Sequence, residues 1–236
     1  MKLSVVVPVF NEARTVEELL RRVQHVRFPK EIVVVDDGST DGTREILARL
    51  EAEARPPAGS HNDLKIIFQP YNRGKGAAVR AGLERVTGDV VIIQDADLEY
   101  DPEDYAKLLD PILADKADVV YGTRFSGGGP HRVLFFWHSL GNRLLTLISN
   151  ALTNLNLTDM EVGYKVFRSE VLKGVKLKSN RFGFEPEITM KAAKKGCRFY
   201  EIPISYHGRT YAEGKKITWR DGVVALYCLI RFRLGD

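Results

Sequence analysis

Apolar residues fall into short runs along the first half of the chain, separated by longer stretches with helical spacing. The run Leu3–Val9 is apolar at nearly every position, as in a strand that is buried on both faces. A helical face follows it, formed by Val16, Leu19, Leu20 and Val23. Strands are predicted in the same way at Leu3–Val9, Glu31–Val35, Leu64–Phe68, Asp89–Gln94 and Val119–Gly122. Alternating strands and helices predict an α/β protein with a mostly parallel sheet and helices on both faces.

Further helices are expected between these strands and after the last of them. The helix after the second strand has Ile46, Leu47 and Leu50 on its apolar face. Ser39 or Thr40 is its predicted N-cap. Other helices are predicted over Gly76–Val86 and from Pro102 and Phe184 onward.

Two amphipathic helices with aromatic and basic edges are predicted within His131–Asn154 and Thr218–Leu234. Helices of this kind bind at a membrane interface, and they also pack on a sheet or on another subunit. The pattern alone leaves both interpretations open. The uncharged stretch Gly222–Ile230 is too short to span a bilayer.

Charged or amide side chains follow each of the five predicted strands. In strand order they are Asn11 and Glu12; Asp36 and Asp37; Asn72, Arg73 and Lys75; Asp95 and Asp97; and Arg124. Ligands of open α/β sheets bind at the carboxyl ends of the strands. We therefore expect these side chains to meet in one site.

Asp95-Ala96-Asp97 directly follows the apolar run Val90–Ile93. Two carboxylates at a strand end suit Mg²⁺ or Mn²⁺, which takes its other ligands from water and substrate phosphates. Glu99 is a candidate third ligand. An isolated Asp-x-Asp is more often a pair of turn residues, but its place after a buried strand favours the metal.

Two further segments indicate nucleotide binding. The carboxylate of Asp37 can accept hydrogen bonds from a nucleobase or ribose, whereas Asp36 also suits a helix cap. In Asn72–Gly76 the glycines let the backbone approach a phosphate, and Lys75 adds positive charge.

Composition indicates an ordinary globular domain, with 44% hydrophobic and 28% charged residues and a net charge of +4. Basic residues outnumber acidic ones between Lys165 and Lys216, which suits phosphate-bearing ligands or an anionic membrane surface. The two cysteines, Cys197 and Cys228, have no metal-binding spacing, and the start of the chain lacks a signal-peptide pattern. We expect a cytoplasmic protein at the cytoplasmic membrane surface.

Several motifs together resemble a known family. Val6–Glu12, Val34–Ser39 and Asp95–Asp97 are similar in order and spacing to the GT-A domain of family 2 glycosyltransferases. The likeness extends through Gly122–Phe125, Leu157–Asp159 and Glu201–Ser205. Within the family, the chain resembles the polyprenyl-phosphate sugar transferases, which include the dolichol-phosphate mannose synthases.

The resemblance implies roles for individual positions. Pro8, Asn11, Glu12 and Asp37 hold the nucleoside; Asp95 and Asp97, with Glu99, hold the metal; Lys75 and Arg124 contact phosphate; and Arg209 with Lys215 and Lys216 belongs to a basic loop over both substrates. Mannose synthases commonly carry Gln where this chain has Glu99, and the basic loop is one residue longer here. The predicted catalytic residues are Asp97, Arg124, Asp159 and Arg209.

The resemblance also predicts the organisation of the chain. A GT-A domain over residues 1–217 comprises a nucleotide-binding half, 1–125, and an acceptor-binding half, 126–217. An amphipathic helix follows over 218–236. The chain lacks the Gln-x-x-Arg-Trp sequence of processive synthases, which favours a single transfer per encounter.

The implied reaction is inverting, metal-dependent transfer of a hexose from GDP-mannose or UDP-glucose to polyprenyl or dolichyl phosphate. A phosphate monoester is largely a dianion at neutral pH, so it needs cations to position it rather than a base. If the acceptor is instead a hydroxyl of a glycan or glycolipid, Asp159 and Glu161 are the candidate bases. A third hypothesis is a non-catalytic nucleotide-binding module. We expect peripheral membrane contact and no nucleic-acid partner.

Overall fold

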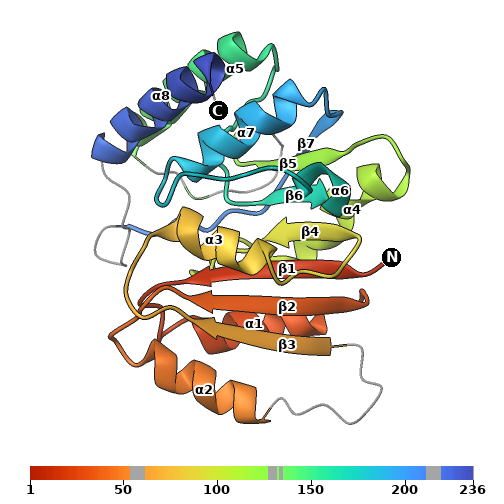
Figure 1. Ribbon diagram of the computed structural model, residues 1–236, viewed down its shortest axis with the longest axis vertical. Helices are drawn as coiled ribbons and strands as arrows, with labels where there is room; N and C mark the ends of the chain where they lie inside the picture. The colour runs from red at the N-terminus through yellow and green to blue at the C-terminus, as the bar shows by residue number, and fades with distance from the viewer. Residues whose placement is uncertain (54–61, 127–131, 133–134, 211–218, 236) are drawn as a thin grey trace.

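The computed structural model describes residues 1–53, 62–126, 132, 135–210 and 219–235. Its centre is a seven-stranded sheet in the order β3-β2-β1-β4-β6-β5-β7, with helices on both faces (Figure 1). The strands are β1 (Leu3–Val9), β2 (Lys30–Asp36), β3 (Asn62–Phe68), β4 (Val90–Ile93), β5 (Val119–Thr123), β6 (Lys165–Arg168) and β7 (Phe199–Pro203). The helices are α1 (Val16–His25), α2 (Thr43–Glu53), α3 (Lys75–Leu83), the 3₁₀ helix η1 (Pro102–Asp104), α4 (Tyr105–Leu113), α5 (Phe136–Thr153), α6 (Ser169–Leu172), α7 (Phe184–Lys194) and α8 (Trp219–Leu234).

Six of these strands run parallel, and β6 runs antiparallel between β4 and β5. The mostly parallel sheet and the five predicted strands are confirmed. The carboxyl ends of β1, β2, β4 and β5 therefore meet at one edge of the sheet, as the pattern of polar residues requires. The short strands β6 and β7 were not predicted.

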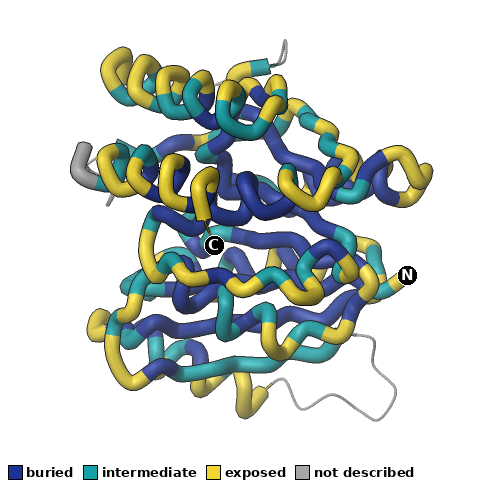
Figure 2. Tube along the Cα trace, turned by 45° about the horizontal axis from the view of Figure 1, so that its top comes forward, coloured by how far each residue is buried: buried dark blue, intermediate teal, exposed yellow. Residues whose placement is uncertain are grey.

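The core lies along the sheet, because β1 and β2 are buried at every position. Figure 2 shows the strands buried through the middle of the molecule and the exposed positions on the surrounding helices and loops. The apolar face predicted for α1 is confirmed, since Val16, Leu19, Leu20 and Val23 are all buried. Burial on both faces explains why Val5–Val9 and Ile32–Val35 are apolar at every position.

Two predicted helix ends are wrong. The helix α2 begins at Thr43, where the Asp41 carboxylate accepts hydrogen bonds from the Thr43 amide at 3.1 Å and from its hydroxyl at 2.5 Å. Ser39 does not cap this helix, because its hydroxyl accepts from the Asn11 amide at 2.9 Å. The helix α3 ends at Leu83, before the predicted Val86.

The two predicted amphipathic helices are present as α5 and α8. The helix α8 buries Ala225, Cys228, Leu229 and Phe232, and it packs against both α5 and α7 (Figure 1). The outer faces of the pair stay exposed and are rich in apolar side chains: Phe136, Trp137, Leu140, Leu144 and Leu147 of α5, and Val223, Val224, Tyr227 and Ile230 of α8. Packing therefore covers one face of each helix and leaves another uncovered.

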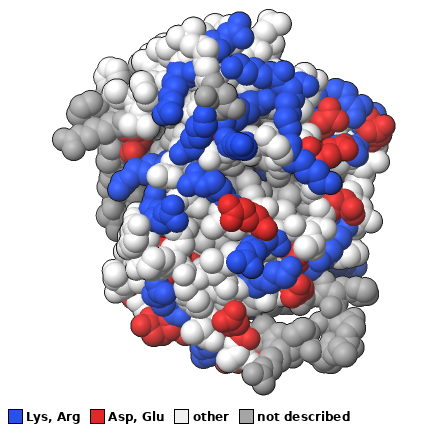
Figure 3. All heavy atoms as spheres, viewed as in Figure 1, with Lys and Arg blue, Asp and Glu red and all other residues white. Residues whose placement is uncertain are grey.

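Lys and Arg side chains gather on the upper part of the molecule in the view of Figure 3, where Figure 1 places α5, α7 and α8. Across the described ranges, the structure holds no helix with both the length and the apolar character needed to cross a bilayer.

The buried carboxylate of Glu31 in β2 connects β1, β3 and the residues just before β4. It accepts hydrogen bonds from the Ser4 hydroxyl at 2.6 Å and the Gly88 amide at 3.1 Å, and it pairs with Lys65 at 2.7 Å. Burial alone would raise the pKa of Glu31, but the hydrogen bonds from Lys65, Ser4 and Thr87 outweigh it and lower the pKa to about 2.

We predict that Glu31→Gln removes part of the acid sensitivity of the fold. The folded-state pKa lies below the ordinary value of 4.5, so the stabilisation is complete above that value and is lost as the pH falls through about 2. The substitution should cost about 2–3 kcal/mol at pH 7 and flatten the pH dependence between pH 4.5 and 2. Urea unfolding across this range measures both effects.

The matched control is Glu18→Gln. The pKa of Glu18 is also lowered to about 2, chiefly by hydrogen bonds from Arg21 and Arg22, but this carboxylate is exposed to solvent, which screens it. Equal losses of stability in the two variants would contradict the role assigned to Glu31.

Candidate active site

A cavity of about 1290 Å³ opens at the carboxyl edge of the sheet and extends to α5 and α8. Most of the predicted site residues line it: Pro8, Glu12, Asp37, Lys75, Asp95, Asp97, Glu99, Arg124 and Arg209. Asn11 and Asp159 lie outside this lining, and Lys215 and Lys216 fall outside the described residues. The strand ends thus contribute to one cavity, as the sequence indicated, although Asp36 and Arg73 also lie outside its lining.

Lys75 connects two acidic residues of the cavity. Its ammonium lies 2.8 Å from Asp95 at the end of β4 and 3.0 Å from Glu185 in the first turn of α7. Burial would lower the pKa of Lys75, but the charges of Asp95 and Glu185 raise it overall. Lys75 is therefore a fixed positive charge beside the first aspartate of the Asp-x-Asp motif.

Arg209 compensates the second aspartate. Its guanidinium lies 3.0 Å from Asp97 and 3.2 Å from Glu12, and its backbone amide donates to Glu99 at 2.7 Å. Burial, followed by the charges of Asp95 and Glu99, raises the pKa of Asp97 to about 7. The two aspartates therefore share a strongly negative environment that needs nearby cations.

The donor set at the end of β4 suits a hard divalent cation only in part. Asp95 and Asp97 offer carboxylate oxygens, the ligands that Mg²⁺ and Mn²⁺ favour. Both oxygens of Glu99 already accept hydrogen bonds, from the Arg209 amide and from the Tyr206 hydroxyl at 3.0 Å. Within the described ranges, no three acidic, His or Cys side chains converge closely enough to hold a metal. Metal binding by Asp95, Asp97 and Glu99 stays a prediction.

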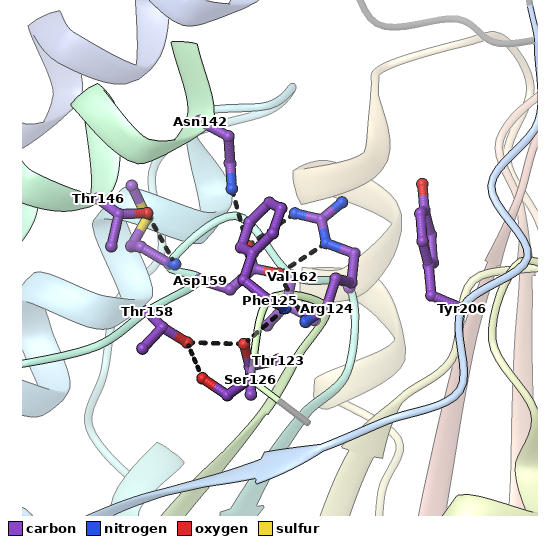
Figure 4. A network of polar contacts seen from close by, with 12 residues as sticks. Thr123, Arg124, Phe125, Ser126, Asn142, Thr146, Thr158, Asp159, Val162 and Tyr206 are labelled. Carbon is purple, nitrogen blue, oxygen red and sulfur yellow. Dashed lines mark hydrogen bonds and ion pairs between the residues drawn. The ribbon is translucent and has the colours of Figure 1, made fainter. Parts of the chain in front are cut away.

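Arg124 at the end of β5 is fixed by Asp159 (Figure 4). Its Nε donates to Asp159 Oδ2 at 2.6 Å, and its Nη2 donates to Oδ1 at 2.7 Å. Asn142 of α5 donates to the same carboxylate at 3.0 Å. Burial would raise the pKa of Asp159, but the Arg124 guanidinium lowers it overall. Asp159 is completely buried, and this bidentate pair holds Arg124 against the cavity.

The turn that carries Asp159 is held from β7. The Glu201 carboxylate accepts hydrogen bonds from the Thr158 amide at 2.9 Å and the Asp159 amide at 3.0 Å. The motifs Leu157–Asp159 and Glu201–Ser205 are therefore in direct contact. Tyr206, which follows β7, places its ring 5.3 Å from the Arg124 guanidinium.

At the nucleotide end, Asp37 shapes the loop before α3. Its carboxylate accepts from the Arg73 amide at 2.8 Å and the Gly74 amide at 2.7 Å, and burial raises its pKa. Asn11 accepts from the Thr40 amide at 2.8 Å. The structure thus shows Asp37 and Asn11 organising the loops, while their contact with a nucleoside stays a prediction.

Sequence reasoning missed three groups that support the site. Asn142 donates to Asp159, the partner of Arg124, and Tyr206 donates to Glu99. Gly163 lies against Asp95 so closely that a Cβ there would be 2.3 Å from the Asp95 carboxylate. Their roles depend on contacts between distant parts of the chain, which no local pattern indicates.

The family model for glycosyl transferase family 2 matches residues 4–175. The chain belongs to this family. The predicted resemblance to family 2 glycosyltransferases is therefore confirmed. The match covers the strand ends and the turn before β6, which together build most of the cavity.

Named relatives extend the similarity over most of the chain. A dolichol-phosphate mannosyltransferase of Pyrococcus furiosus is 32% identical over 91% of this chain, and an undecaprenyl-phosphate mannosyltransferase of Micrococcus luteus is 29% identical over 91%. The chain spans 59% of the length of the first relative and 87% of the second.

Solved structures confirm the predicted GT-A fold. A glucosyl-3-phosphoglycerate synthase from Mycobacterium tuberculosis, in complex with Mn²⁺, UDP and phosphoglyceric acid, is 19% identical with a TM-score of 0.73. The comparison covers 100% of this chain and 79% of that one. The same synthase has also been solved with Mg²⁺ and UDP.

We predict that Asp159→Ala lowers the free energy of unfolding by about 3–5 kcal/mol, because it leaves the Arg124 guanidinium buried without its partner. Asp159→Asn keeps the volume and should cost less. The control is Asp118→Ala, which breaks a bidentate pair with the largely exposed Arg198 and should cost about 1 kcal/mol. Urea denaturation compares the three variants, and similar losses for the two alanine variants would contradict the prediction.

Proposed function

We propose that this chain transfers a hexose from GDP-mannose or UDP-glucose to polyprenyl or dolichyl phosphate, with inversion and with a divalent metal. One observation carries the proposal. A single cavity joins the acidic pair Asp95 and Asp97 to the cations Arg124 and Arg209 and then to apolar side chains of α5 and α8. A nucleotide sugar and a lipid phosphate together need this sequence of acidic, basic and apolar surfaces.

Asp95 and Asp97 would hold Mg²⁺ or Mn²⁺ against the donor diphosphate. The bound cation would offset the negative charge that develops on the leaving nucleoside diphosphate. Lys75 and Arg209 already lie on these two carboxylates, so they are placed to contact the same diphosphate. The complexes of the M. tuberculosis synthase with UDP and either Mn²⁺ or Mg²⁺ support this choice of metal.

The nucleoside would occupy the end of the cavity near β1 and β2. Pro8, Glu12 and Asp37 line that end, and Asn11 fixes the adjoining loop. Lys215 and Lys216 would add positive charge over the donor. The predicted halves, 1–125 for the nucleotide and 126–217 for the acceptor, would then meet along this cavity.

The acceptor phosphate would be positioned by Arg124 and Arg209. Because such a phosphate is already a dianion, oriented cations suffice and no proton needs to be removed. Asp159 supports this assignment, because its carboxylate is occupied by Arg124 and Asn142. Its role would be to position Arg124 rather than to act as a base.

The apolar part of the cavity would receive the start of the prenyl chain. Leu145 and Ile148 of α5 and Leu226 of α8 line it. Beside it, the exposed Trp137 and Tyr227 would contact the cytoplasmic surface of the membrane. The basic side chains on this part of the molecule would face anionic headgroups (Figure 3). The names of the two mannosyltransferase relatives support a lipid phosphate as acceptor.

We predict that a radiolabelled donor transfers its sugar to dolichyl or undecaprenyl phosphate in the presence of Mn²⁺ or Mg²⁺. The label should enter the organic phase and be released by mild acid, as a glycosyl phosphate is. Label found only in water-soluble glycans would instead favour a sugar-hydroxyl acceptor, for which the buried Glu161 is the remaining candidate base.

Replacing Asp97 by Asn should reduce metal-dependent turnover by at least about 100-fold, since one of the two metal-binding carboxylates is lost. The fold should persist, because the residue lies in a turn after β4. The exposed Asp110→Asn serves as control and should leave turnover unchanged. Turnover of the Asp97 variant at the wild-type rate would overturn the metal assignment; circular dichroism checks the fold.

A further inference from the structure

Two buried carboxylate oxygens in the cavity are unpaired. Glu161 Oε1 and Glu185 Oε2 have no hydrogen-bond partner within the described ranges. Both residues line the cavity, and Glu185 is only 3% exposed. Buried polar groups in native proteins nearly always have partners, so these two oxygens mark an unmet hydrogen-bonding requirement in residues that line the cavity.

The backbone around Glu161 is firmly held, although Oε1 of its side chain has no partner among the described residues. The buried ammonium of Lys165 donates to the carbonyl of Met160 at 2.9 Å and to that of Val162. The Met160 amide donates to the Thr146 hydroxyl at 3.1 Å. The turn therefore presents the Glu161 carboxylate in a fixed place, as a preorganised binding group requires.

The same turn lies directly beside Asp95. The Gly163 amide donates to the Tyr100 hydroxyl at 3.0 Å, and the Gly163 Cα faces the Asp95 carboxylate with no room for a side chain. On its other side, Asp95 reaches Glu185 through the Lys75 ammonium. Glu161 and Glu185 thus line the part of the cavity next to the proposed diphosphate site.

The charge of this region selects the kind of ligand. Burial, followed by the charge of Glu185, raises the pKa of Glu161 to about 8, so near neutral pH Glu161 is a neutral acid beside the Glu185 carboxylate. Neither group offers positive charge to a phosphate, so the unpaired oxygens do not mark a phosphate site. The Glu185 carboxylate already contacts Lys75, and within the described part of the chain no group of three acidic side chains is arranged for a second metal. A neutral molecule with several hydroxyl donors satisfies both oxygens.

We propose that Glu161 and Glu185 accept hydrogen bonds from the hydroxyls of the transferred sugar and so determine which hexose the enzyme uses. The assignment rests on the proposed function, in which the sugar is attached to the diphosphate beside Asp95. It goes further in naming the side chains that distinguish one hexose from another. A site built to bind a hydroxyl discriminates strongly against the donor that lacks it.

The test combines Glu161→Gln with deoxygenated donors. The parent donor and its 2-, 3-, 4- and 6-deoxy analogues are compared for binding and for turnover, the latter including hydrolysis without an acceptor. Glu185→Gln is examined in the same way. Glu187→Gln is the matched control, because Glu187 lies on the same helix and is buried, but both its oxygens accept backbone amides, of Lys178 and Ser179.

With the wild-type chain, removing a contacted hydroxyl should lower kcat/KM by at least about tenfold. Glu161→Gln should lower kcat/KM for the parent donor by about tenfold. With the donor that lacks the contacted hydroxyl, the variant and the wild-type chain should have the same kcat/KM, because both changes remove one contact. Glu185→Gln should show the same pattern with a different hydroxyl. The affinity for GDP or UDP with Mg²⁺ should change by less than about threefold, since neither nucleotide carries the sugar. Glu187→Gln should affect all donors equally.

Equal losses with every deoxy donor, or a parallel loss of GDP and UDP affinity, would overturn the sugar assignment while leaving the proposed function intact. A loss confined to turnover with hydroxyl acceptors would make Glu161 a base instead. If the wild-type chain binds a nucleotide sugar but glycosylates no lipid phosphate, the proposed acceptor is wrong. The comparison of deoxy donors then still tests whether Glu161 and Glu185 contact the sugar. Failure to bind any nucleotide sugar would overturn both.

Discussion

Compensation of buried negative charge is the constraint on which the site depends. The end of β4 and its neighbours bring Glu12, Asp95, Asp97, Glu99 and Glu185 to one cavity. So many carboxylates cannot remain ionised together without cations among them. Lys75 and Arg209 supply that charge from two distant parts of the sequence. The parallel sheet makes the arrangement possible, because it delivers all these strand ends to one edge.

The acidic region and the cationic region of the cavity are stabilised differently. Lys75 and Arg209 each lie between two or more carboxylates, so neither is held by one acid alone. Arg124 has a dedicated partner in Asp159, which is itself held by Asn142 and by Glu201 through the backbone. Lys75 and Arg209 are thus shared among several carboxylates of the cavity, whereas Arg124 is held by a partner of its own.

The fold was largely predictable because burial on both faces leaves a run of apolar residues, Val5–Val9 in β1 and Ile32–Val35 in β2. The strand β6 escaped prediction because it begins with Lys165 and ends with Arg168, so it lacks the uninterrupted apolar run of the equally short β4. The Lys165 ammonium is buried, where it donates to the carbonyl of Met160. The strand β7 lies at the edge of the sheet and is half-exposed. The start of α2 depends on Asp41, whose carboxylate accepts a hydrogen bond from the Thr43 amide. Ser39 and Thr40 nearby are equally suitable cap residues by type, so the sequence alone does not select Asp41.

The site was predictable as a set of residue types and less so as a set of partners. The strand ends and the Asp-x-Asp motif are local patterns, and the cavity gathers them as expected. The pairs Arg124–Asp159, Lys75–Glu185 and Arg209–Asp97 join residues that are far apart in the sequence. Only the folded chain shows which acid each cation compensates.

The single reversed strand has a further consequence. Because β6 runs against its neighbours β4 and β5, it brings its beginning rather than its end to the active edge. The short turn before it, with Glu161 and Gly163, therefore lies between the loops that follow two parallel strands. A substitution in this turn changes the cavity wall without altering the strand ends that carry Asp95 and Arg124. Under the proposed function, such a substitution would alter substrate preference while the groups that contact phosphate stay in place.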